Sequence, residues 1–145
     1  MVTVESFTMD HTKVKAPFVR KCGVQIGENG DIVTKFDLRF MQPNKESIPT
    51  AAIHALEHLL AGYMREEIQG VIDLSPMGCR TGFYFIVWGE HDIEEVQKAL
   101  ISALHKVLLA TEVPAANEIQ CGNYRDLSLF GAKEYAKYVI QGFNA

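Results

Sequence analysis

Hydrophobic and polar side chains alternate regularly over residues 31–40 of the chain. The two sets of alternating positions are Ile32, Thr34, Phe36, Leu38 and Phe40 on one face, and Val33, Lys35, Asp37 and Arg39 on the other. Strict alternation of this kind predicts a strand that is buried on one face. Apolar stretches at residues 71–75 and 83–88 predict two further strands. Residues 1–22 mix polar and apolar types without a clear period.

Three other stretches have features typical of helices. The first helix is expected over residues 49–69, with a start at Ser47 and Pro49 and a stop at Gly70. It is apolar or small on almost every side, which predicts that it is central and buried.

The second helix begins at the capping box formed by Asp92 and Glu95, and its apolar stripe extends from Ile93 to Leu108. The third helix is expected over residues 128–141, with Gly142 as its stop. Residues 117–127 give no clear pattern. Short connections between strands, combined with long helices, predict an α+β fold in which an antiparallel sheet packs against helices.

Composition narrows the class of protein. The 145 residues are 48% hydrophobic and 22% charged, which favours one globular domain over residues 1–145. A net charge of −4 without a basic run argues against nucleic acid as a partner. No apolar run is long enough to span a membrane, and the first residues do not have the pattern of a secretory leader. The widely spaced Cys22, Cys79 and Cys121 are typical of reduced thiols, so we expect a cytoplasmic protein.

The strongest functional signal is His54-x-x-Glu57-His58 inside the first predicted helix. At about 100° per residue, the three side chains share one arc of the helix. Two imidazoles one turn apart can hold one metal ion, and a carboxylate beside them can move a proton. The arc is flanked by small residues, namely Ala51, Ala55, Ala61 and Gly62. We therefore expect this face to point into the protein or into an interface, and to hold a metal.

Two histidines supply only half of a four-coordinate site. The candidates for a third ligand are His11, His91, His105, Cys79 and Cys121, of which His91 and His105 are better explained as structural or solvated. The residues alone do not decide between the two cysteines. Two other classes share parts of the pattern: a metallopeptidase with the inverted motif, and a metal-binding module without catalysis.

Cys79 has the surroundings of a reactive thiol. It lies in a predicted loop between Gly78 and Gly82, and the adjacent Arg80 would favour the thiolate. Cys121, followed by Gly122, could add a soft ligand to the two histidines. Nothing near Cys22 suggests reactivity.

Five short motifs follow one another in a fixed order over almost the whole chain. They are DHTKVKAP at 10–17, FDLRF at 36–40, HALEHL at 54–59, SPMGCRTGFY at 75–84 and QCG at 120–122. With them the chain resembles the S-ribosylhomocysteine lyase (LuxS) family, the autoinducer-2 synthases of bacteria. The resemblance implies a divalent metal, iron(II) with zinc or cobalt as substitutes, held by His54, His58 and Cys121. It implies Glu57 and Cys79 as the acid/base pair, and substrate binding by Ser6, His11, Arg39 and Asp73.

The same resemblance implies an activity and an assembly. S-ribosylhomocysteine would be cleaved to homocysteine and 4,5-dihydroxypentane-2,3-dione, the precursor of the quorum-sensing signal autoinducer-2, by carbonyl migration and β-elimination of the thioether. The reaction would serve the activated methyl cycle. The enzyme would be an α+β homodimer with two active sites at its interface. Phe18 and Ala55 depart from the family's frequent residues without touching these positions, and the match is poor after Gly122.

Overall fold

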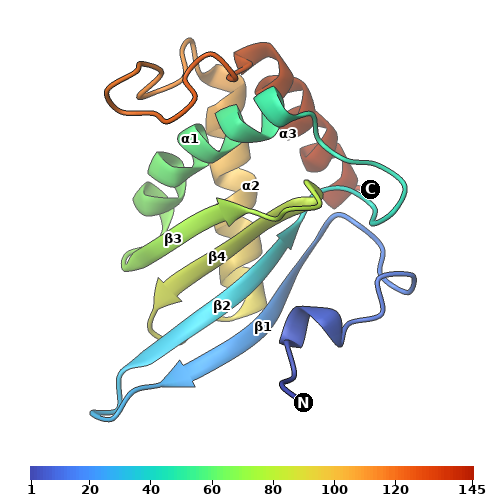
Figure 1. Cartoon of the computed structure of the whole chain (residues 1–145), viewed down its shortest axis with the longest axis vertical. Coiled ribbons are helices and arrows are strands. Elements are labelled where there is room, and N and C mark those ends of the chain that lie inside the picture. Colours follow the sequence, from blue (N-terminus) through green and yellow to red (C-terminus); the bar gives the residue numbers. More distant parts are fainter.

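The computed structural model describes residues 1–145 as a four-stranded antiparallel sheet and three helices. The strands lie in the order β1-β2-β4-β3, with bounds Phe18–Ile26 for β1, Ile32–Arg39 for β2, Gly82–Trp88 for β4 and Val71–Pro76 for β3. The helices α1 (Thr50–Glu67), α2 (Ile93–Leu109) and α3 (Leu129–Phe143) pack together against one face of this sheet (Figure 1). The predicted α+β fold with an antiparallel sheet is confirmed.

The core lies between the helices and one face of the sheet. Alternate residues of β2 and β4, including Phe36, Leu38, Phe83 and Phe85, are fully buried there against apolar side chains of all three helices. A strand places every second side chain on the same face, so Asp37 and Arg39 must point to the opposite face of the sheet. No helix is both long and apolar enough to cross a bilayer.

Strand β1 was not predicted from the sequence. Arg20 and Lys21 are consecutive polar residues in it, and a bulge between Lys21 and Gly23 shifts its register against β2. A bulge adds one residue to one strand and so changes the face that later side chains occupy. The alternation on which the prediction relied is therefore interrupted in the middle of the strand.

The prediction that β2 is buried on one face only is wrong for its C-terminal half. Asp37 and Arg39 are 0% and 2% exposed, although they lie on the face away from the helices. Charged residues are buried when they are paired. Here the Arg39 guanidinium donates hydrogen bonds to both oxygens of the Asp37 carboxylate, at 3.0 and 2.8 Å. Arg20 on β1 makes a second ion pair with the same carboxylate.

Two predicted helix ends differ in detail. The first helix starts at Thr50 after Pro49, and no side chain caps it, so Ser47 is not its cap. The last helix continues through Gly142 to Phe143. A Cβ at Gly142 would come within 2.6 Å of the Pro17 ring, so this glycine provides room for packing instead of a stop.

Two glycines bring the elements of the site into place. Gly131 near the start of α3 packs so closely on α1 that a Cβ would lie 2.8 Å from the Cβ of Ala52. Gly82 begins β4 directly against the backbone of Leu38 and Arg39, where a Cβ would clash. Because β-sheet neighbours are fixed by such contacts, the turn before Gly82 is held at the end of β2.

Candidate metal centre and a separate thiol site

Helix α1 and the loop after α2 bring three metal-ligating side chains together. The side chains of His54, His58 and Cys121 each offer one atom within 4.8 Å of the other two, and all three are half-buried. The imidazole rings lie edge to face with centroids 4.8 Å apart, and the Cys121 sulfur is 3.5 Å from Nε2 of His54. The structure thus selects Cys121 from the candidates for a third ligand.

Backbone carbonyls orient both imidazoles. Nδ1 of His54 donates a hydrogen bond to the carbonyl oxygen of Asp126 at 2.8 Å, and Nδ1 of His58 donates to that of Pro114 at 2.7 Å. With the proton on Nδ1, the lone pair of each Nε2 is free to bind a metal. Hydrogen bonds at the ring nitrogen that does not bind the metal fix the tautomer and ring orientation of metal-binding histidines.

The loop that carries Cys121 is ordered by its own hydrogen bonds. The side-chain oxygen of Asn117 accepts from the backbone N–H groups of Ile119 and Gln120, both at 3.0 Å. The carbonyl oxygen of Asn117 accepts from the N–H of Cys121 at 3.0 Å. The N–H of Asn123 then donates to the Cys121 sulfur at 3.4 Å.

The donor set fits a divalent metal. Two neutral imidazole nitrogens and one thiolate sulfur are ligands that iron(II), cobalt(II) and zinc accept. Three protein ligands leave a fourth position open, as in catalytic sites. The predicted metal-binding set of His54, His58 and Cys121 is therefore consistent with the structure, while the identity of the metal stays a prediction.

Glu57 lies beside this set, in a hollow of about 320 Å³. The hollow is lined by Glu57, His58, Ala61, Arg65, Asp73, Leu74, Pro114 and Ala115. The structure therefore brings the predicted residues Glu57 and Asp73 together with His58 of the donor set. Asp73 accepts a hydrogen bond from the Ser75 hydroxyl at 2.8 Å. Glu57 is half-buried and makes no side-chain hydrogen bond, so its carboxylate is available to a bound molecule.

Cys79 occupies a different hollow, of about 310 Å³, lined by Asn44, Lys45, Glu46, Ser47, Cys79 and Thr81. It is exposed on the turn between β3 and β4. Arg80 has a φ of +59°, and this left-handed residue turns the chain between Cys79 and Thr81. The Cys79 sulfur lies 3.0 Å from the Thr81 hydroxyl oxygen. The guanidinium of Arg80 instead donates to the carbonyl of Ile48 at 3.0 Å. The expected stabilisation of the Cys79 thiolate by Arg80 is therefore not supported by a direct contact between the two side chains.

Polar contacts run from Cys79 across the outer face of the sheet to the N-terminus. Arg39 donates to the Thr81 hydroxyl at 3.2 Å and is paired with Asp37, which is paired with Arg20. Arg20 also pairs with Glu5 in the short helix η1 (Glu5–Phe7), which contains Ser6. Burial disfavours a charged Arg20, but its bonds to Glu5 and Asp37 outweigh this and raise its pKa.

The remaining predicted substrate-binding residues stay predictions. Ser6 is half-buried and makes no side-chain hydrogen bond. His11 uses one ring nitrogen on the carbonyl oxygen of Met9 at 2.9 Å, which leaves the other nitrogen free. Arg39 is 2% exposed and is held by Asp37 and Thr81, so less of it is open to a ligand than the sequence suggested.

Within one chain, Cys79 lies apart from His54, His58 and Cys121. His54, His58 and Cys121 belong to the helical layer, whereas Arg39 lies on the face of the sheet away from the helices. In Figure 1 the β3–β4 turn (yellow-green) and the loop after α2 (orange) lie apart, with α1 between them. The predicted site residues therefore form two groups, one around the metal ligands and one around the thiol.

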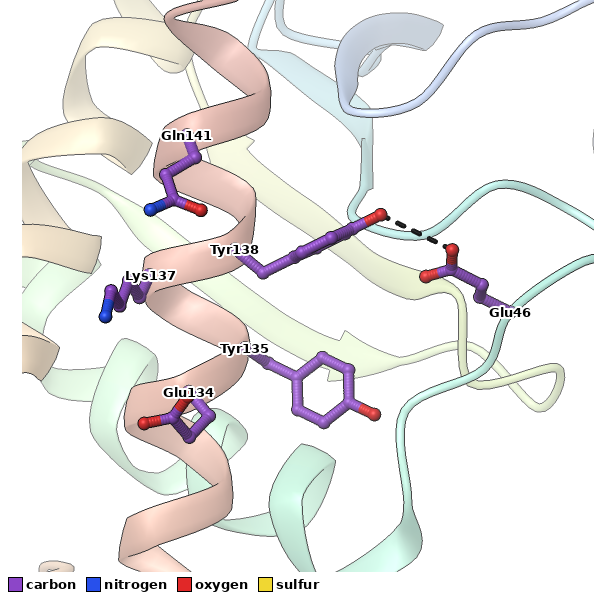
Figure 2. Close-up of a pocket in the computed structure, with 6 residues that line it drawn as sticks. All are labelled: Glu46, Glu134, Tyr135, Lys137, Tyr138 and Gln141. Carbon is purple, nitrogen blue, oxygen red and sulfur yellow. Dashed lines mark hydrogen bonds between the residues drawn. The ribbon is translucent and has the colours of Figure 1, made fainter.

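The largest hollow contains neither a predicted metal ligand nor Cys79, although Glu46 also lines the Cys79 hollow. It measures about 530 Å³ and is lined by Glu46, Glu134, Tyr135, Lys137, Tyr138 and Gln141. Figure 2 shows Tyr138 pointing from α3 toward Glu46, to which its hydroxyl donates at 3.4 Å. The lining has charges of both signs and no metal-ligating group other than carboxylates, so its chemistry does not match that of the motifs.

The candidates His91 and His105, together with Cys22, lie away from both groups. His91 bridges Glu95 and the carbonyl of Trp88 at 2.8 and 2.9 Å, and His105 is exposed on α2. Burial opposes charge on His91, but the bond to Glu95 raises its pKa overall. Burial raises the pKa of the Cys22 thiol, which is 3.4 Å from the carbonyl of Lys35. None of these three residues joins either group.

Several residues of these groups were not found from the sequence. Arg65 lines the Glu57 hollow, and its position seven residues after His58, on the same side of α1, would have revealed it. Thr81 and Asp37 are buried polar residues that share Arg39 as a hydrogen-bond partner, and Asp37 also pairs with Arg20 of the neighbouring strand. The carbonyls of Asp126 and Pro114 carry no sequence signal, because every residue has a carbonyl.

The fold and the two groups define the class of protein: an α+β protein with an open His/His/Cys donor set and a separate exposed thiol. The chain belongs to the S-ribosylhomocysteinase (LuxS) family, since the sequence model described by that name matches residues 4–144. The predicted resemblance is thereby confirmed, and with it the prediction that the chain is an enzyme of the lyase class.

Curated relatives agree with the family. A protein of Clostridioides difficile named S-ribosylhomocysteine lyase is 67% identical over 145 residues, which cover 99% of this chain and 96% of the relative. Proteins of the same name from Clostridium botulinum and Enterococcus faecalis are 63% and 57% identical. Those matches cover 99% and 97% of this chain, and 96% and 91% of the relatives.

Proposed function

We propose that this protein cleaves S-ribosylhomocysteine to homocysteine and 4,5-dihydroxypentane-2,3-dione in a metal-dependent reaction. The observation that carries the proposal is the open donor set of His54, His58 and Cys121 with the carboxylate of Glu57 beside it. Family membership and relatives named for this substrate support it. A metallopeptidase would not need the reactive thiol of Cys79, and a simple metal-binding module would need neither Cys79 nor Glu57.

His54, His58 and Cys121 would hold the metal, which we propose to be iron(II), with zinc or cobalt as substitutes. A divalent ion there would act as a Lewis acid toward the carbonyl and hydroxyl oxygens of the sugar. The thiolate ligand donates charge, which favours a moderate Lewis acid. The hydrogen bonds that His54 and His58 donate to the carbonyls of Asp126 and Pro114 support the site, because each directs the other ring nitrogen toward the place where the three donors meet.

The chain's own residues would move the protons. The Cys79 thiolate removes the proton from the carbon next to the sugar carbonyl and returns it to the neighbouring carbon, so that the carbonyl moves from C1 through C2 to C3. Glu57 transfers protons between the oxygens and assists removal of the proton at C4. The C4–H electrons then form a C4=C5 double bond as the C5–S bond breaks, and the sulfur leaves with its electron pair and takes a proton to complete homocysteine. The enol that remains takes a proton at C5 and loses its hydroxyl proton, which gives the dione.

Each complete site would need two copies of the chain. We place the metal group of one copy opposite the Cys79 group of the other, in a homodimer with two equivalent sites. One support is that the two groups lie apart in a single chain (Figure 1). Another is that His54, Glu57 and His58 on α1 are only half-buried, so this face of the helix is accessible to a second copy. The same arrangement would place Ser6, His11 and Arg39 of one copy, and Asp73 of the other, around one substrate.

The product would be the precursor of autoinducer-2, and homocysteine would return to the methyl cycle of the cytoplasm. Both roles depend on the cleavage reaction.

Metal-dependent release of a thiol tests the proposed function. Purified protein incubated with S-ribosylhomocysteine is expected to release homocysteine, measured with a thiol-reactive dye after subtraction of the protein's own cysteines. Removal of the metal by a chelator should abolish release, because the oxygens of the sugar would no longer be polarised. Reloading with iron(II), cobalt(II) or zinc should restore it.

The control is protein that has been treated with the chelator and then reloaded, because it separates loss of metal from damage. Equal rates of thiol release by metal-free and reloaded protein would contradict metal dependence. No release under any loading would contradict the function itself.

A further inference from the structure

The Thr81 hydroxyl contacts both a cation, the Arg39 guanidinium, and the sulfur of Cys79. Its oxygen lies 3.0 Å from the Cys79 sulfur and accepts a hydrogen bond from Nη1 of Arg39 at 3.2 Å. Thr81 is 4% exposed, so water has almost no access to this hydroxyl. No other side chain or backbone group bonds to it.

The contact with Arg39 restricts what the hydroxyl can do. A guanidinium has only donors, so the Thr81 oxygen must be the acceptor in that bond. The hydroxyl hydrogen then has one remaining partner, the Cys79 sulfur. A neutral thiol that donated to the same oxygen would leave the buried hydroxyl hydrogen unpaired, which is costly. The arrangement that satisfies every group is donation from Thr81 to the sulfur, and that bond is strongest when the sulfur is charged.

The network behind Thr81 is buried and paired by several hydrogen bonds. Arg39 is 2% exposed and Asp37 is fully buried, and two hydrogen bonds of 3.0 and 2.8 Å join them. The backbone carbonyl of Thr81 also accepts from the N–H groups of Phe40 and Met41 at 2.8 and 2.9 Å. These contacts hold the Arg39 donor and the Thr81 backbone next to each other.

We propose that Thr81 is a positioning residue that donates its hydroxyl hydrogen to the Cys79 sulfur and stabilises the thiolate, with Arg39 holding the hydroxyl in that direction. The proposal deepens the proposed function, on which it rests for the use of this thiolate as the base. It assigns to Thr81 the role that the sequence suggested for Arg80, whose guanidinium is engaged at Ile48.

Alkylation of Cys79 tests the proposal without the substrate. Metal-loaded parent protein, Thr81→Val and Thr81→Ser are treated with iodoacetamide near pH 7, and modification at Cys79 is followed by peptide mass spectrometry. Thr81→Val keeps the shape but removes the donor, so Cys79 should react about tenfold more slowly. Thr81→Ser retains a hydroxyl and should restore the rate to within about threefold of the parent.

Two readouts separate this role from a structural one. Above about pH 10, where an ordinary thiol is ionised, the rates of Thr81→Val and the parent should converge, because only the fraction of thiolate differs. Modification of the half-buried Cys22 should not change, which reports an intact fold. If Thr81→Val does not fold, Thr81→Ala removes the same donor and replaces it in the comparison.

Equal Cys79 alkylation in Thr81→Val and the parent near pH 7 would overturn the proposal, as would a slow rate that persists above pH 10. A protein that fails to cleave S-ribosylhomocysteine but shows the expected alkylation rates would contradict the proposed function and leave this inference standing. If cleavage occurs, Thr81→Val should lower kcat and leave KM unchanged, since Thr81 acts through Cys79.

Discussion

Cys79→Ala is expected to lower kcat for homocysteine release by about a thousandfold, while the protein keeps its metal. A positioned general base contributes about a hundred- to ten-thousandfold to a proton transfer, and this reaction needs Cys79 at more than one carbon. Cys79 makes its only side-chain hydrogen bond to Thr81 and does not belong to the donor set. Its removal should therefore leave metal binding unchanged. Steady-state thiol release and metal content per chain measure the two effects.

Cys22→Ala is the matched control, because it removes a half-buried thiol that belongs to neither group. It should keep kcat within about twofold of the parent, as surface and partly buried substitutions outside a site do. Normal homocysteine release by Cys79→Ala would show that another group removes the proton. Loss of metal from Cys79→Ala would show that the donor set includes this thiol.

Cys121→Ala is expected to lose both the metal and the activity. The substitution removes one of three ligands and the only sulfur among them. Loss of a partner that merely orients a ligand already costs about ten- to a hundredfold in metal affinity, so loss of a ligand itself should exceed about a hundredfold. Metal content after gel filtration measures the loss. In cobalt-loaded protein, the sulfur-to-cobalt absorption band of the parent should be absent from the variant.

Asp126 gives a control for this second variant, because only its backbone carbonyl orients His54. Asp126→Ala retains that carbonyl and should retain the metal. A Cys121→Ala protein that bound metal as tightly as the parent would mean that another residue is the third ligand.

The parts of the molecule that were predicted depend on local sequence. The helical spacing around Val96 and Val139 and the cap at Asp92 act within one or two turns, and α2 and α3 lie where they were expected. His54, Glu57 and His58 share one helical arc for the same reason. The bulge in β1 removed the period on which a strand prediction depends, so β1 was missed.

The rest of the site depends on contacts between distant residues. Cys121 meets His54 across 67 positions of the chain, and residues 117–127 have no regular pattern from which this approach could be predicted. Arg39 can be buried because it bonds to Asp37 on β2 and to Thr81 in the β3–β4 turn, while Arg20 on β1 pairs with the same Asp37 carboxylate. Alternation alone placed Arg39 on a solvated face, because it does not include the pairing that lets charge be buried.

The most direct test of the account uses a dimer that contains one Cys79→Ala chain and one Cys121→Ala chain, purified through two different tags. If the thiol group of one copy faces the metal group of the other, one of the two sites combines an intact Cys79 with an intact donor set. The mixed dimer should then release homocysteine at about half the rate of the parent dimer, although each variant alone is inactive. A mixed dimer as inactive as the two variants would contradict a site built from two copies.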